Sequence, residues 1–157
     1  MRRLLVIVLL AACRDQGTPI NLPDADVASY QASVHPILEA RCATLDCHGD
    51  LDRPLRLYAE TGLRAADALR GQPITPAELD ANARALIAVD PAPDGRPSLV
   101  LTKPLAGTVK HIGGDQWDST DEPQYLCVAG WLDGRIDDPD VAAACIAAAA
   151  EVELPPP

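Results

Sequence analysis

Apolar side chains recur at helical spacing in the part of the chain that follows the N-terminal segment. Residues 27–41 place them every three or four positions, at Val27, Tyr30, Val34, Ile37 and Leu38. This periodicity predicts a helix. Because proline lacks the amide hydrogen that continues a helix, we expect a kink or a restart at Pro36, which is tolerated in a first turn.

Two more helices are predicted in the middle of the chain. Residues 59–70 are rich in alanine and end before Gly71, which is typical of a helix and its C-terminal stop. A second helix starts after Thr75 and runs to about residue 89. Thr75 can cap it, a proline occupies the first helical position, and Glu78 completes the spacing of a capping box.

The last part of the chain predicts helices at 121–132, where Gly134 provides the stop, and at 139–153. The remaining segments are a loop at 42–52, an extended stretch at 53–58, a loop at 90–97, an apolar turn or short strand at 98–102 and an irregular stretch at 103–119. The expected fold is therefore a small, mostly α domain with long irregular loops. Long loops in a small domain are uncommon unless they carry function.

The N-terminus predicts export. Two arginines precede the apolar run 4–10, which is far shorter than the roughly 20 residues of a membrane-spanning helix. Together with two alanines, this run indicates a signal peptide over 1–12. The sequence Leu-Ala-Ala-Cys ending at Cys13 resembles the lipobox of bacterial lipoproteins, whose cysteine is acylated. Arg14 then favours the outer membrane, facing the periplasm or the surface.

The domain boundaries follow from these segments. Residues 13–26 form a polar tether behind the lipid anchor, 27–153 form one domain, and 154–157 form a disordered tail. The formal net charge of −10 argues against binding to nucleic acid or to anionic lipid by charge. The chain has no Phe, and 48% of its residues are hydrophobic, so a bulky apolar cofactor would help to fill its core.

One short stretch carries most of the chemistry. Cys42, Cys47 and His48 stand in the order Cys-x4-Cys-His, which is the order of c-type haem attachment with two additional residues between the cysteines. In such sites each cysteine forms a thioether to the haem, and the adjacent histidine ligates the iron. We therefore expect one covalently bound haem c at these residues.

The sixth iron ligand is predicted by subtraction. Cytochromes commonly use Met or His, and Met1, in the signal peptide, is the sole methionine. His35 lies on the same predicted helix as Cys42, where we expect it on the surface and on the proximal side. His111 lies in a loop and is followed by two glycines, which let a flat ligand approach. We therefore favour His48 and His111 as the axial pair.

Two alternatives use the same residues. Cys42, Cys47, His48 and His111 also form a Cys2His2 set for structural zinc. A plain Cys42–Cys47 disulfide in a non-haem envelope lipoprotein, with a binding or structural role, is the other alternative. In either case Cys127 and Cys145 are expected to pair, because exported thiols meet an oxidising environment.

Some side chains are open to two interpretations. Arg53, Arg56 and Arg64 either pair with haem propionates or lie on the surface. Trp117 and Trp131 either pack on a haem or belong to the core. The sequence contains no Ser–His–Asp order, no phosphate-binding loop and no dinucleotide fingerprint. Because two histidine ligands would fill both axial positions of the iron, we expect an electron carrier rather than a catalyst.

The segment from Val34 to Gly134 resembles the cytochrome c-like domains of exported lipoproteins of planctomycetes and myxobacteria. The resemblance rests on VHPILEARCATLDCHG, on Ser98-Leu99, on Lys103-Pro104-Leu105, on His111-Ile112-Gly113-Gly114, on Tyr125 and on Trp131-Leu132-Asp133-Gly134. It implies a cytochrome c-like helical fold and places the haem at Cys42, Cys47 and His48. We also expect a monomeric carrier whose partners are other exported redox proteins.

Overall fold

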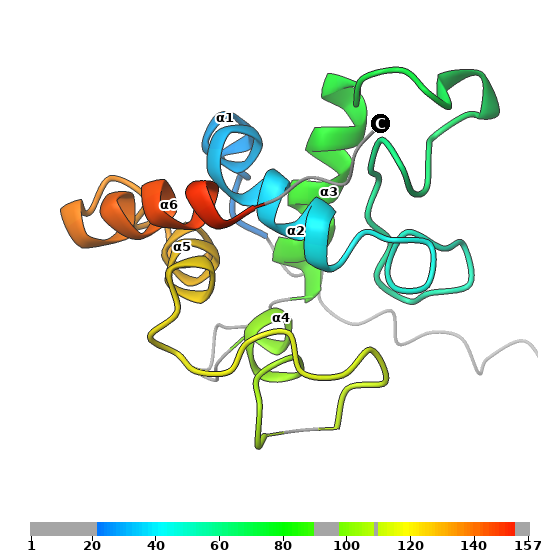
Figure 1. Cartoon of the computed structure of the whole chain (residues 1–157). Coiled ribbons are helices and arrows are strands. Elements are labelled where there is room, and N and C mark those ends of the chain that lie inside the picture. Colours follow the sequence, from blue (N-terminus) through cyan, green and yellow to red (C-terminus); the bar gives the residue numbers. More distant parts are fainter. Residues whose placement is uncertain (1–21, 90–97, 109, 153–157) are drawn as a thin grey trace, which may run out of the picture.

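The computed structural model describes residues 22–89, 98–108 and 110–152. The predicted signal peptide, the lipidation site Cys13 and the tail 154–157 lie outside these ranges. The described part is mostly helical, which confirms the predicted fold class. The helices are α1 (Val27–Ser29), the π turn η1 (Tyr30–Val34), α2 (His35–Arg41), the 3-10 turn η2 (Asp67–Leu69), α3 (Pro76–Val89), α4 (Leu99–Thr102), α5 (Pro123–Leu132) and α6 (Pro139–Glu151) (Figure 1). No helix of the described residues is long and apolar enough to cross a membrane.

The N-terminal helical run is continuous from α1 to α2 but contains one π turn. Asp26 caps it by accepting a hydrogen bond from the Ser29 amide at 3.1 Å. The His35 amide then bonds to the Tyr30 carbonyl, five residues back. Pro36 lies in the first turn of α2, as expected from its missing amide hydrogen. The run therefore passes Pro36 without a break, and its irregularity is the π turn just before it.

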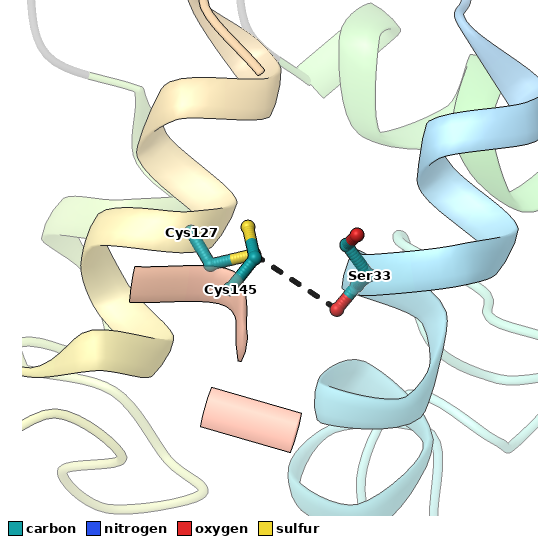
Figure 2. The surroundings of a disulfide bond; sticks show 3 residues. All are labelled: Ser33, Cys127 and Cys145. Atoms are coloured by element: carbon teal, nitrogen blue, oxygen red, sulfur yellow. Dashed lines mark hydrogen bonds between the residues drawn. A yellow bond between two sulfur atoms is a disulfide. The ribbon is translucent and has the colours of Figure 1, made fainter. Parts of the chain in front are cut away.

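Helices α5 and α6 pack closely against each other and lie beside this run (Figure 1). Gly130 of α5 allows the close approach, because a Cβ there would collide with the Val141 side chain of α6. Cys127 and Cys145, which the sequence analysis paired, form a disulfide between the two helices, with their Cα atoms 4.8 Å apart. Cys127 Sγ also lies 3.9 Å from the Ser33 carbonyl oxygen of the π turn (Figure 2).

Both tryptophans belong to the core, so their core interpretation is the correct one. Trp117 is fully buried and meets Tyr125 edge-on, with ring centroids 6.3 Å apart. The Trp131 ring packs 5.3 Å from Tyr30, and its Nε1 donates to the Asp26 carbonyl at 3.0 Å. Two indoles replace part of the volume that phenylalanine would supply to this core.

Residues 59–70 are not a helix, so that prediction was wrong. The segment is irregular apart from the short turn η2. The reason is Arg64, whose buried guanidinium donates to the carbonyl oxygens of Leu69, Gln72 and Pro73. These carbonyls can point at one cation only if the chain wraps around it, and a regular helix would direct them along its axis. The prediction of a helix rested on the alanine content, which takes no account of the contacts of Arg64.

Helix α3 begins as predicted. The Glu78 amide donates to Thr75 Oγ1 at 3.3 Å, and the Thr75 amide donates to Glu78 Oε2 at 2.9 Å. This reciprocal pair is a capping box. Residues 99–102 form the short helix α4, capped by Ser98, instead of a strand. The extended stretch 53–58 is limited to one isolated bridge between Tyr58 and Leu63.

Candidate functional site

A cleft of about 450 Å³ lies between the loop after α2, the C-terminal half of α3, helix α4 and the loop 103–113. Its apolar wall comes from Leu38, Leu55, Leu57, Leu86, Val89 and Val100. The volume and the mostly apolar wall with a few polar groups are typical of a binding site for an organic cofactor. All four predicted site residues, Cys42, Cys47, His48 and His111, line this cleft.

The cysteine loop is folded by its own backbone. The His48 amide donates to the Cys42 carbonyl at 2.8 Å, and the Gly49 amide donates to the Thr44 carbonyl at 2.9 Å. A side chain at Gly49 would collide with the Ala43 carbonyl oxygen. The four residues between the cysteines are therefore absorbed in a compact turn, and both cysteines still line the cleft.

Cys42 and Cys47 are free thiols. The alternative Cys42–Cys47 disulfide is therefore not formed in this structure. Burial, and after it the neighbouring Cys47, raises the pKa of the Cys42 thiol to about 12. Cys42 is accordingly a protonated thiol at neutral pH.

His48 is oriented by the chain that follows it. Its Nδ1 lies 3.0 Å from the Leu55 carbonyl oxygen, and the Leu57 amide donates to the His48 carbonyl at 2.8 Å. A histidine that donates Nδ1–H to a carbonyl presents its Nε2 lone pair to a metal. Burial lowers the pKa of His48, and nearby His111 lowers it further, so the ring is held in the neutral form that ligates metals.

His111 is held in the same way by a different loop. Its Nδ1 lies 2.9 Å from the Gly114 carbonyl oxygen, and Gly114 adopts a φ of 78° that favours glycine. A Cβ at Gly113 would lie 3.0 Å from His111 Cε1 and 3.8 Å from Cys47 Sγ. Gly113 thus leaves room for the His111 ring beside Cys47, and His111 also keeps its Nε2 free.

The two imidazoles face one cleft as a pair. Their ring centroids are 6.0 Å apart, and their planes differ by 20°. A metal–imidazole bond is about 2.0–2.1 Å long. If one ion lay between two Nε2 atoms, two such bonds plus the distance from each Nε2 to its ring centroid would separate the centroids by about 6 Å. The centroid separation is therefore close to that of two imidazoles bound to one ion.

Positive side chains flank the cleft. Arg53, Lys103 and Lys110 line it, and the Arg53 guanidinium donates to the Asp46 carbonyl at 2.9 Å. Of Arg53, Arg56 and Arg64, Arg53 is the one that lines the cleft. Arg64 is buried against Glu78, and Arg56 is exposed and does not line the cleft. The lysines Lys103 and Lys110 were not selected as site residues, because isolated surface lysines carry no sequence signal.

His35 does not line the cleft. The expectation that it is exposed was wrong, since only 6% of its surface is accessible. Its Nε2 lies 3.4 Å from Glu39 Oε2, and its ring packs 5.8 Å from that of Tyr30. The π turn rotates the first turn of α2 inward, which a regular helical projection does not anticipate.

The zinc alternative has less support from the geometry. Within 22–89, 98–108 and 110–152, no three His, Cys, Asp or Glu side chains converge to hold a metal ion. The four site residues therefore share a cleft without forming a tetrahedral set. Comparison with protein families, curated proteins and solved structures finds no significant match. The geometry of the cleft therefore carries the functional argument.

Proposed function

We propose that the chain is a cytochrome c-like electron carrier that holds one haem in the cleft. The observation that carries this proposal is the histidine pair: both Nδ1 atoms are engaged by backbone carbonyls, and the rings lie 6.0 Å apart in one cleft. Two histidines prepared in this way fit the two axial positions of a single iron. The apolar wall supports the same assignment, because a porphyrin is flat and largely apolar.

The cysteines would provide the covalent attachment. The thiols of Cys42 and Cys47 line the cleft and are not joined to each other. In a c-type site each S–H adds across one haem vinyl group, with the hydrogen going to a vinyl carbon, so that nothing is lost in the reaction. Arg53, Lys103 and Lys110 would then receive the two propionates, because guanidinium and ammonium groups pair with carboxylates.

The proposed role is electron transfer rather than catalysis. When bound, haem iron supplies a one-electron couple, and two histidine ligands leave no open position for a substrate. The carbonyls of Leu55 and Gly114 would keep the two imidazoles oriented toward the bound group. We further propose that Cys13 anchors the chain by a lipid in the outer membrane, and that exported redox proteins are its partners.

The test is expression of the full chain together with a cytochrome maturation system. We expect a red protein with a Soret band whose haem stays on the polypeptide in a denaturing gel. His111→Ala should turn a low-spin spectrum into a high-spin one, because the sixth position loses its ligand. His35→Gln, a buried histidine away from the cleft, is the matched control and should stay low-spin.

Other outcomes would contradict the proposal. A colourless protein with a Cys42–Cys47 disulfide by mass spectrometry would favour the non-haem envelope lipoprotein. Stoichiometric zinc with no haem would favour the Cys2His2 alternative. A low-spin spectrum in His111→Ala would show that another group is the sixth ligand.

A further inference from the structure

The loop that carries His111 is closed at its base. The Pro104 carbonyl accepts hydrogen bonds from the amides of Gln116 at 2.7 Å and Trp117 at 3.1 Å. The Ala106 amide donates to the Trp117 carbonyl at 2.9 Å. These bonds bring the two ends of the loop together, but they leave the position of its tip, at His111, to other contacts.

One side chain ties the tip to this base. Gln116 Nε2 donates to the Gly113 carbonyl at 3.0 Å, and the Gly114 amide donates to the His111 carbonyl at 3.0 Å. The place of the His111 ring therefore depends on where Gln116 is held. Gln116 is half-buried, and its own backbone carbonyl points away from the loop toward α2.

Arg41 contacts Gln116 from the end of α2. Arg41 Nη1 donates to the Gln116 carbonyl, and its guanidinium carbon lies 5.5 Å from the centre of the Trp117 ring. Arg41 is the last residue of α2 and directly precedes Cys42. A hydrogen bond from a charged donor and a cation–π contact thus connect the cysteine side of the cleft to the loop of His111.

We propose that Arg41 is a positioning residue that latches the His111 loop over the cleft and so keeps His111 in the sixth position of the iron. The inference rests on the proposed function. Arg41 itself does not line the cleft and acts through Gln116. Removal of the latch increases the fraction of molecules in which His111 has left the iron.

The effect is measurable with an external ligand. A ligand that competes with His111 binds only the open form, in which His111 has left the iron. Its apparent affinity is the intrinsic affinity multiplied by the fraction of molecules in the open form. A hydrogen bond from a charged group contributes enough to change such an equilibrium by about 10- to 100-fold. Arg41→Gln should therefore strengthen binding of the competing ligand by at least about tenfold.

The experiment uses the lipid-anchored or detergent-solubilised full chain with haem attached, reduced with dithionite and titrated with carbon monoxide. We expect Arg41→Gln to keep its covalent haem and to bind carbon monoxide at least about tenfold more tightly than the parent protein. Arg41→Lys should lie between the two, because an ammonium keeps the charge near Trp117 but not the planar fork. Arg135→Gln, at an exposed arginine paired with Asp133, is the matched control.

A second variant keeps the inference testable if Arg41→Gln does not fold. Gln116→Ala removes only the side-chain bond to Gly113 and should give the same direction of change. Carbon monoxide affinity within twofold of the parent in every variant that folds would overturn the latch and leave the haem proposal intact. If neither variant folds, Arg41 acts in folding and the latch is overturned. A colourless parent protein would overturn both proposals.

Discussion

Replacing Glu78 by glutamine tests how much of the fold depends on one buried ion pair. The side chains of Arg64 and Glu78 are 1% and 0% exposed. The Glu78 carboxylate accepts bonds from the Arg64 guanidinium at 2.9 and 3.0 Å, from the Ala65 amide at 2.8 Å, and from the amide and hydroxyl of Thr75, both at 2.9 Å. All of these groups are donors, so the amide nitrogen of glutamine would face a donor wherever it pointed.

Two estimates of the cost agree. The hydrogen bond from Arg64, with those from Ala65 and Thr75, outweighs the opposing effect of burial and lowers the pKa of Glu78 from 4.5 to about 2, which corresponds to about 3 kcal/mol at about 1.4 kcal/mol for each pH unit. Removing one member of a buried ion pair costs about 3–5 kcal/mol, because it leaves the other charge buried and unpaired. A domain of this size has a free energy of unfolding of about 5–15 kcal/mol, so Glu78→Gln should remove a large fraction of it.

The assay is urea unfolding followed by circular dichroism, with Asp80→Asn as the control. Asp80 is on the same helix and pairs with Arg84 at 2.9 Å, but both side chains are largely exposed, so its loss should change little. The pH dependence has a definite sign. Because the folded-state pKa of Glu78 is lowered, its stabilisation is complete above about pH 4.5 and is lost as the pH falls toward 2.

The difference in unfolding free energy between the parent and Glu78→Gln should therefore be largest at neutral pH and narrow by pH 3. A loss below about 1 kcal/mol at pH 7 would refute the reasoning, since it would mean that Arg64 finds other partners or water. A difference that does not change between pH 7 and pH 3 would refute the assignment of the low pKa to this pair.

Two further predictions concern the cysteines outside the cleft. Cys127→Ser/Cys145→Ser should lower the unfolding free energy by about 3 kcal/mol, since the disulfide closes a loop with a sequence separation of 18 residues; an unchanged urea midpoint would contradict this. Cys13→Ser should move the chain from the membrane fraction to the soluble fraction or leave it unprocessed, because acyl chains provide the proposed anchor. Retention of Cys13→Ser in detergent-soluble membranes would count against the lipid anchor.

The helices that the sequence predicted correctly are those whose signals are local. The capping box at Thr75 and Glu78 and the apolar periodicity around Tyr30 lie within a few residues of the structure that they specify. The failure at 59–70 has a long-range cause. Arg64 pairs with Glu78, 14 residues later in the chain. The sequence pattern within 59–70 therefore does not indicate that Arg64 is buried.

The residues of the site also divide into those with a local sequence signal and those without one. Cys42, Cys47 and His48 were identified from their order, and His111 by elimination among three histidines. The structure places all four on one cleft. The groups that orient the rings, the carbonyls of Leu55 and Gly114, are backbone atoms, which every residue has and no sequence pattern distinguishes. The contact from Arg41 to residue 116 spans 75 positions and likewise leaves no local signal.

The π turn at Tyr30–Val34 sets the angular register between the two halves of one helical run. Each residue of an α-helix advances by about 100°, so one inserted residue rotates everything after it by that angle. Tyr30, at the start of the turn, packs on Trp131, and Leu38, which lines the cleft, is buried in the same core. Removing one residue would restore a uniform helix and rotate Leu38 by about 100° relative to Tyr30. A single insertion thus lets one side of the run extend from the core to the wall of the cleft.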